Sequence, residues 1–314
     1  MRERAPLCHV VLLTVALGTA SPASAGQQAA AEPGAVVAPS AAALRAEPLG
    51  PWPPLQRLQP GASANVENAL PETLAESVDR CVASSLAATG VPGAAVAVLV
   101  DGQLAYSKGY GVKHRRNGGE VTAQTTFRIG SITKMMTAAA VLQQIEAGRV
   151  SLDDPVTRLV PELSLSGRRS ADLVTVRHIL THTSAIPDLP FELDGPHDAS
   201  GMTVWVVDHA GTTLHAQPGA FYNYSNPNYL LAGLVAERAS AVPYHRLMDE
   251  AVWGPAGMTA TTLDPAVVMA RGNYSYGHFH NAMGREQIVA PDAYDNWAIA
   301  PAGYAFSTAP DLVR

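Results

Sequence analysis

The stretch from Ser131 to Gly148 places a hydroxyl and an amine at the start of an apolar helix. Residues 135–142 are all apolar apart from Thr137, polar residues follow, and Gly148 is typical of the position just after a helix. This pattern predicts that Ser131 lies on the first turn and Lys134 one turn further on. Side chains three residues apart on a helix are neighbours, with Cβ atoms roughly 5–6 Å apart.

Ser131 and Lys134 have the chemistry of a nucleophile and its general base. A serine hydroxyl is a weak nucleophile until a neighbouring group takes its proton, and burial lowers the pKa of a lysine so that it can be that group. The helix N-terminus would also stabilise negative charge developing at Ser131. In the alternative, Ser131 only caps the helix and Lys134 is solvated. The apolar neighbours Met135, Ala138 and Ala139 favour a buried lysine instead.

The N-terminal residues 1–25 have the features of a secretory signal peptide. Arg2 and Arg4 precede an apolar centre at 10–17, and residues 23–25 (Ala-Ser-Ala) form a cleavage pattern. The apolar run is shorter than the roughly 20 residues that span a bilayer. We therefore expect cleavage, a secreted or periplasmic mature protein and no stable membrane insertion.

Beyond the leader, residues 26–70 are rich in Ala, Pro, Gly and Ser and predict a disordered linker, so the folded domain is expected at 71–314. With 47% hydrophobic and 15% charged residues the chain can bury a sizeable core, and its formal charge of −6 argues against nucleic acid as a partner. Cleavage would remove Cys8. Cys81 would then be alone on a helical pattern, where we expect a small buried side chain.

The remaining pattern mixes helices with short strands. A hairpin is predicted at 96–106 around the turn Asp101-Gly102. His278 and His280 alternate like strand residues in a glycine-rich part of the chain, and we expect them on a loop surface. Helices are predicted at 74–88, 174–180, 226–240 and 243–253, and the pattern at 204–210 fits a helix or a strand.

A second group of polar side chains follows a turn and precedes a helix at 226–240. The hydroxyl of Tyr224 could face Ser131 there, and the amide of Asn226 could orient Lys134 or a substrate amide. The alternative is that Tyr224 is a core or interface aromatic like its neighbours.

Taken together, these motifs resemble the penicillin-recognising serine hydrolases, in the branch of class C β-lactamases, D-alanyl-D-alanine carboxypeptidases and related esterases. The resemblance implies an α/β fold of the β-lactamase-like or transpeptidase-like type: an antiparallel sheet flanked by helices, with a mostly helical subdomain. It implies no cofactor and no metal, and a small-molecule or peptide substrate. The matching segments are 127–134, 152–155, 179–184, 224–226, 257–258, 302–303 and 307–312.

The resemblance also implies roles for individual residues. Ser131 would attack a carbonyl and form an acyl-enzyme, and its backbone N–H would supply half of an oxyanion hole. Tyr224 would carry the proton to the leaving group. Asn226 would position Lys134 and bind the substrate. Whether Lys134 or Tyr224 is the general base stays open, because the two would titrate as a coupled pair.

The sequence departs from the family pattern in two places. The usual glycine after the motif at 181–184 is Ala185, which would be strained if the loop needs positive φ. The family's third motif, Lys or His followed by Thr or Ser and Gly, is absent between Tyr224 and Arg314. A helix start is predicted at 308–311. We therefore expect a C-terminally incomplete domain that lacks the last strands of the sheet and leaves an apolar edge on the hairpin.

The first hypothesis is an exported serine hydrolase that acylates Ser131 with a β-lactam, a D-Ala-D-Ala peptide, or an ester or amide. The second is a non-catalytic binding or sensor relative, or a truncated pseudoenzyme. A third is a metal-dependent hydrolase using His178 and His182, which are four residues apart; with no third ligand placed nearby, we expect both to be structural. The oligomeric state is left open.

Overall fold

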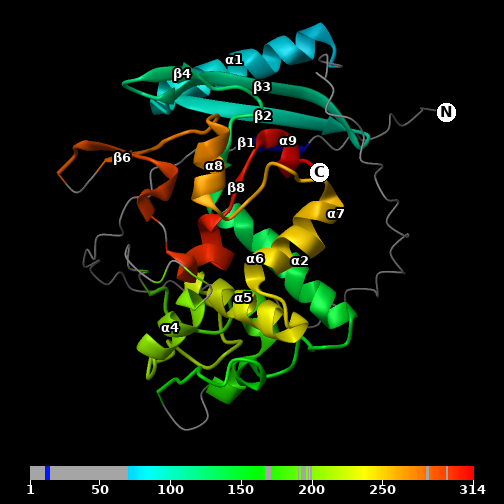
Figure 1. The fold of residues 1–314 in the computed structure, drawn as a ribbon, viewed down its shortest axis with the longest axis vertical. Coiled ribbons are helices and arrows are strands. Elements are labelled where there is room, and N and C mark those ends of the chain that lie inside the picture. Colours follow the sequence, from blue (N-terminus) through cyan, green and yellow to red (C-terminus); the bar gives the residue numbers. More distant parts are fainter. Residues whose placement is uncertain are drawn as a thin grey trace, which may run out of the picture.

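The computed structural model of this 314-residue chain describes residues 11–14 and 70–314, except 167–170, 190, 192–195, 197, 199, 281–282 and 295. Most of the predicted signal peptide and linker therefore lies outside the described residues. In Figure 1 a sheet with helix α1 on its outer face lies at one end, and the helical part of the chain extends away from its other face.

The main sheet is antiparallel, with strand order β1-β2-β3-β4. Strands β2 (Gly93–Val100) and β3 (Gln103–His114) form the predicted hairpin, and β4 (Gly118–Glu120) pairs with the end of β3. Asp101 and Gly102 both have positive φ, 48° and 75°, as tight two-residue hairpin turns require. Most of β2 is buried because helices cover both faces of the sheet.

The free edge of β2 is covered, so the expectation of an exposed apolar edge was wrong for this structure. Strand β1 (Val11–Thr14) pairs antiparallel with β2, with Val11 opposite Leu99 and Thr14 opposite Val96. This strand comes from the apolar centre of the predicted signal peptide. Its partner lies more than 80 residues away in sequence, so no local pattern indicated the pairing.

Helix α1 (Glu72–Thr89) confirms the predicted first helix and ends at Gly90, whose φ is 69°. Its inner side packs Ala75, Val78 and Val82 against the sheet. Cys81 is exposed, which corrects its expected burial: only a narrow stripe of α1 reaches the sheet, and Cys81 lies beside that stripe.

The helical part is built around α2 (Thr133–Glu146) and α5 (Asn226–Ser240), which pack against each other. Residues 227–236 of α5 are all buried, so this helix is the centre of the main hydrophobic core. The pattern at 204–210 falls largely in a helix, α4. The shorter helices are α3 (Val176–Leu180), α4 (Gly201–Asp208), α6 (Tyr244–Leu247), α7 (Gly254–Ala256), α8 (Pro265–Arg271) and α9 (Ala309–Leu312).

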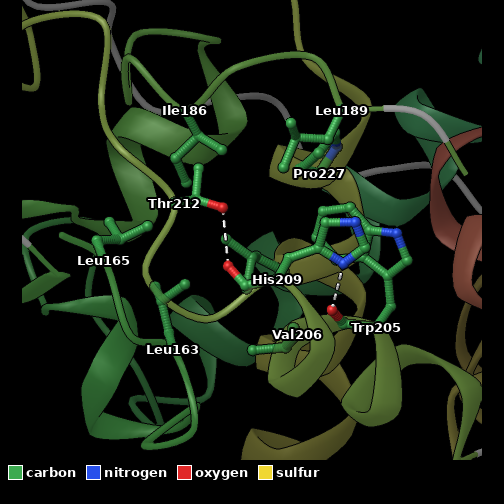
Figure 2. A pocket seen from close by; sticks show the side chains of 10 residues that line it. Leu163, Leu165, Ile186, Leu189, Trp205, Val206, His209, Thr212 and Pro227 are labelled. Atoms are coloured by element: carbon green, nitrogen blue, oxygen red, sulfur yellow. Dashed lines mark hydrogen bonds between the residues drawn. The ribbon is translucent and has the colours of Figure 1, made fainter.

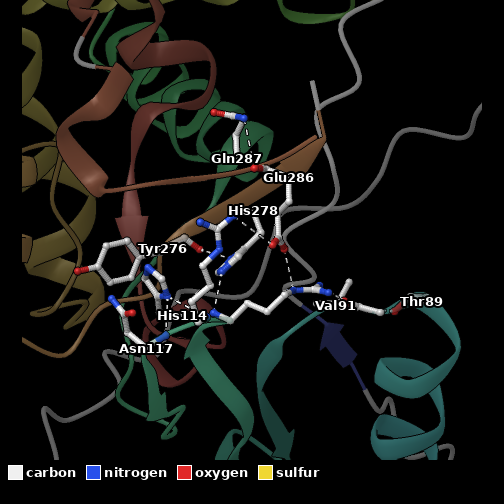
Figure 3. Close-up of polar contacts among 11 residues, drawn as sticks. Thr89, Val91, His114, Asn117, Tyr276, His278, Glu286 and Gln287 are labelled. Carbon is white, nitrogen blue, oxygen red and sulfur yellow. Dashed lines mark hydrogen bonds and ion pairs between the residues drawn. The ribbon is translucent and has the colours of Figure 1, made fainter. Parts of the chain in front are cut away.

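A second hairpin, β6 (Gly277–His280) and β7 (Glu286–Val289), docks on the end of β3. Figure 3 shows His278 close to His114, and the two ring centroids are 6.0 Å apart. The backbone N–H of Arg115 donates to His278 Nε2 at 3.1 Å, and Arg115 Nε lies 2.8 Å from Glu286 Oε1. His278 is thus a half-buried strand residue rather than the expected loop-surface residue, because this docking covers it; His280 is exposed.

Within the described part of the chain, no helix combines the length and apolar character needed to cross a membrane.

Candidate active site

A two-stranded pair leads the chain into the nucleophile turn. Strand β5 (Phe127–Arg128) pairs with β8 (Phe306–Ser307), and the chain then forms a 3₁₀ turn, Gly130–Ile132, that continues as α2. Gly130 has φ 54°, which a residue with a Cβ rarely adopts. Ser131 thus lies at the opening of α2, as predicted, with an exposed side chain.

Lys134 is buried one turn further on, with 5% of its surface exposed. Its Nζ donates to Ser131 Oγ at 3.0 Å, to Asn226 Oδ1 at 2.7 Å and to the carbonyl oxygen of Ala302 at 2.6 Å. Burial lowers the pKa of Lys134 to about 8, although the carboxylate of Asp188 opposes this shift. A lysine with that pKa holds a usable fraction of neutral amine near neutral pH.

The third partner of Lys134 comes from an irregular turn far along the chain. Residues Ala300–Tyr304 form a wide turn, broken by a non-helical backbone at Gly303, that packs on the start of α2. The carbonyl of Ala302 accepts from Lys134, and that of Pro301 accepts from the hydroxyl of Thr137 at 2.7 Å. The sequence motif at 302–303 pointed to this segment but not to a backbone acceptor.

Tyr224 lies on the loop before α5 and reaches the nucleophile. Its hydroxyl is 2.8 Å from Ser131 Oγ, and its ring centroid is 4.9 Å from Lys134 Nζ. Burial raises the pKa of Tyr224, which opposes ionisation of the phenol. Ser131 Oγ is therefore within hydrogen-bond distance of both groups that could move its proton.

Asn226, the first residue of α5, completes the set of four predicted side chains that the structure brings together. Its Oδ1 accepts from Lys134, while its Nδ2 donates to Asp188 Oδ1 at 3.2 Å. The backbone N–H of Asn226 donates to the same carboxylate oxygen at 2.8 Å. Sequence reasoning missed Asp188, and the only available signal was its place just after the motif at 181–184.

His182 accepts hydrogen bonds from the backbone of the loop that carries Tyr224. Its Nδ1 accepts from the backbone N–H of Ser225 at 3.1 Å, and its carbonyl accepts from the backbone N–H of Asn223 at 2.7 Å. Burial, and then the charge of Lys134, lower the pKa of His182 to about 4. The ring is therefore neutral at ordinary pH, with Nδ1 as the acceptor.

The loop that carries His182 is strained at Ala185, as expected. Ala185 has φ 62° and is buried. A left-handed backbone costs a residue with a Cβ roughly 1–2 kcal/mol. The structure therefore confirms that this position needs positive φ, where glycine would be unstrained.

The two histidines of the metal hypothesis are both engaged within the protein. His178 Nδ1 accepts from the backbone N–H of Thr175 at the start of α3 (3.2 Å), while His182 Nδ1 accepts from Ser225. In the described part of the chain, no group of three His, Cys, Asp or Glu side chains is arranged to hold a metal ion. Both contacts fit the structural roles expected of these residues.

A small apolar pocket lies beside the loop that carries Asp188. Figure 2 shows Leu189 and Pro227 on one side of it and the rings of Trp205 and His209 on another. Its volume of about 20 Å³ has room for roughly one water molecule. It is therefore a packing gap behind the site and too small for a substrate.

An antiparallel sheet covered by helices and joined to a helical part that presents Ser131 is the architecture of the β-lactamase-like and transpeptidase-like fold. Solved structures that share it include the following two. The octameric penicillin-binding protein homologue from Pyrococcus abyssi has a TM-score of 0.63 at 27% identity over 76% of this chain and 55% of that one. The D-alanine carboxypeptidase AmpC from Burkholderia cenocepacia has a TM-score of 0.62 at 27% identity over 77% of this chain and 63% of that one.

The profile of the beta-lactamase family matches residues 78–314, and the chain belongs to that family. Its members include serine β-lactamases and carboxypeptidases. Penicillin-binding protein 4 of Amycolatopsis lactamdurans is 30% identical over 226 residues, which are 71% of this chain and 58% of that protein. Protein flp of Staphylococcus aureus is 26% identical over 244 residues, 76% of this chain and 47% of its own length. The chain thus spans about half the length of these curated relatives.

Proposed function

We propose that this protein is an exported serine hydrolase that forms an acyl-enzyme on Ser131. The observation that carries the proposal is the position of Ser131 Oγ, 3.0 Å from Lys134 Nζ and 2.8 Å from Tyr224 OH. A nucleophile within hydrogen-bond distance of a base, with that base oriented by a third group, is the general arrangement for covalent catalysis. Here the third group is Asn226.

Lys134 is the better candidate for the general base. Its pKa is lowered to about 8, whereas that of Tyr224 is raised, so near neutral pH the amine gives up its proton far more readily than the phenol. In the proposed step, neutral Lys134 takes the proton of Ser131 as its oxygen bonds to the substrate carbonyl carbon. That proton then moves from Lys134 by way of Tyr224 to the leaving group as the bond between the leaving group and the carbonyl carbon breaks, so both residues return to their neutral forms. Water later attacks the acyl carbon, and its second proton returns to Ser131 Oγ as the acyl group is released.

The substrate class follows from this chemistry. The proposed substrates are small molecules or peptides with a carbonyl attached to a leaving group: a β-lactam, a D-Ala-D-Ala peptide, an ester or an amide. The names of the penicillin-binding and carboxypeptidase relatives support the first two. Export is proposed from the signal-peptide pattern of residues 1–25.

Labelling with a fluorescent fluorophosphonate and a fluorescent penicillin tests the proposal. We expect the wild type to be labelled, Ser131→Ala to stay unlabelled, and Ser84→Ala, an exposed serine on α1, to behave as wild type. The labelling rate should rise with pH through about 8 as Lys134 loses its proton. Labelling by fluorophosphonate alone would favour esters or amides over β-lactams. Equal labelling of wild type and Ser131→Ala would refute the nucleophile, and an unlabelled wild type would favour a non-catalytic binding or sensor role.

A further inference from the structure

The side-chain amide of Asn226 lies between an ammonium and a carboxylate. On one side Lys134 Nζ donates to Oδ1 at 2.7 Å; on the other Nδ2 donates to Asp188 Oδ1 at 3.2 Å. Asp188 Oδ1 also accepts from the backbone N–H of Asn226 at 2.8 Å. The carboxylate of Asp188 thus accepts from both the backbone and the side chain of Asn226.

Both neighbours select the same amide orientation. A lysine amine donates and a carboxylate accepts, so the amide oxygen faces Lys134 and the amide nitrogen faces Asp188. In the flipped amide the NH₂ group would oppose the donors of Lys134, and the oxygen would lie against the carboxylate. The acceptor oxygen of Asp188 therefore determines which Asn226 atom Lys134 meets.

This orientation decides where the lone pair of neutral Lys134 points. A neutral amine has two N–H bonds and one lone pair, and Lys134 Nζ has three partners: Asn226 Oδ1, Ala302 O and Ser131 Oγ. The first two can only accept. They take the two protons and leave the lone pair for the hydroxyl of Ser131. With a flipped amide, the lone pair would instead accept from Asn226.

We propose that Asp188 is a positioning residue of this site: by holding the Asn226 amide oxygen toward Lys134, it directs the lysine lone pair at Ser131. This inference rests on the proposed function of Ser131 and names a residue that acts on the base through Asn226.

Charge and positioning can be separated at Asp188. The groups facing Lys134 Nζ are the rings of Tyr224 and Tyr229, the neutral imidazole of His182 and the carboxylate of Asp188. Asp188 is the anion among these groups, and it raises the pKa of Lys134 against the effect of burial. Asp188→Asn keeps an oxygen that can accept from Asn226 but removes the charge, whereas Asp188→Ala removes both.

Rates of fluorophosphonate labelling across pH measure both effects. Asp188→Ala should label on the order of 10-fold more slowly than wild type, the usual size of the effect of losing an orienting partner. Asp188→Asn should keep a rate within about threefold of wild type while the midpoint of its pH profile moves below that of wild type. Asp264→Ala is the matched control, because Asp264 accepts two backbone N–H groups at the start of α8. It should leave rate and midpoint unchanged.

A wild-type rate and midpoint in Asp188→Ala would overturn the proposal. So would equal losses in Asp188→Ala and Asp264→Ala, which would indicate a general effect of losing a helix cap.

A second measurement does not depend on Ser131 being reactive. The chain has three lysines, Lys108, Lys113 and Lys134, so ¹³C labelling of the lysine ε-carbons gives a spectrum simple enough to follow Lys134 by NMR. Its titration should have a midpoint near 8 in the wild type and a lower one in Asp188→Asn. Unchanged titration would refute the link between Asp188 and Lys134, whereas an unlabelled wild type with the expected titration shift would count against the proposed hydrolase alone.

Discussion

The imidazole of His182 lies against the ring of Tyr224, with the two ring centroids 4.5 Å apart. The same imidazole accepts from the backbone N–H of Ser225, the next residue of the loop. Because His182 is buried and neutral, it fixes both the side chain and the backbone of this loop without adding a second positive charge beside Lys134. The position of the Tyr224 hydroxyl therefore depends on the protonation state of His182.

Replacing His182 with glutamine should make the stability of the fold less sensitive to acid. The pKa of His182 is about 4 in the folded chain and 6.5 ordinarily. Its neutral ring therefore stabilises the fold fully above pH 6.5, and this contribution is lost as the pH falls toward 4. Glutamine keeps an acceptor for Ser225 but does not titrate. The free energy of unfolding, measured with urea, should therefore fall less between pH 7 and pH 4.5 in His182→Gln than in the wild type. His215 is exposed, so His215→Gln is the control. If His182→Gln lost as much stability between the two pH values as the wild type does, His182 would not be the group responsible.

Two tyrosines of one loop give a matched pair for the proton-transfer step. Tyr224 OH is 2.8 Å from Ser131 Oγ, whereas Tyr222 is 66% exposed and makes a ring contact with His182. Tyr224→Phe should slow acylation by roughly 10²–10⁴-fold, the typical contribution of a positioned proton donor or acceptor. Tyr222→Phe should stay within about twofold of wild type. The labelling rates of the two variants test this prediction, and circular dichroism checks that both variants are folded. Similar rates for Tyr224→Phe and Tyr222→Phe would show that Tyr224 takes no part in proton transfer.

Two alanines with positive φ predict different responses to glycine. Ala241 follows α5 with φ 58° and is exposed, whereas Ala185 has φ 62° and is buried. Ala241→Gly relieves left-handed strain at the cost of a more flexible unfolded chain, for a net gain of about 0.5–1 kcal/mol in the free energy of unfolding. Ala185→Gly also loses a buried methyl group worth about 0.8 kcal/mol, so its net effect should be near zero. Urea unfolding of both variants checks this; destabilisation by Ala241→Gly would show that the left-handed strain is smaller than supposed.

The features that could be predicted from the sequence are those set by local spacing. Ser131 and Lys134 are three residues apart on one helix, and Asp101-Gly102 has the chemistry of a tight turn, so both placements followed from neighbouring residues. The place of Tyr224 and Asn226 beside Ser131 came from a motif, because nothing local links segments more than 90 residues apart.

The features that were missed depend on contacts between distant segments. Asp188 meets Asn226 across 38 residues, and the carbonyl of Ala302 meets Lys134 across 168. Neither contact leaves a periodic or compositional signal. Cys81 was misplaced for a related reason: its helical pattern indicated an apolar side, but the width of the buried stripe depends on how α1 sits on the sheet.

The wide turn at Ala300–Tyr304 has a consequence for comparing related sequences. A regular α-helix closes its carbonyls within its own backbone, whereas here those of Pro301 and Ala302 accept from α2. The oxygen that accepts one proton of Lys134 therefore depends on the shape of the backbone. Any residue whose side chain permits this turn would place the same carbonyl oxygen there. Residue identity alone would not reveal whether a relative keeps this part of the site; the path of its main chain would.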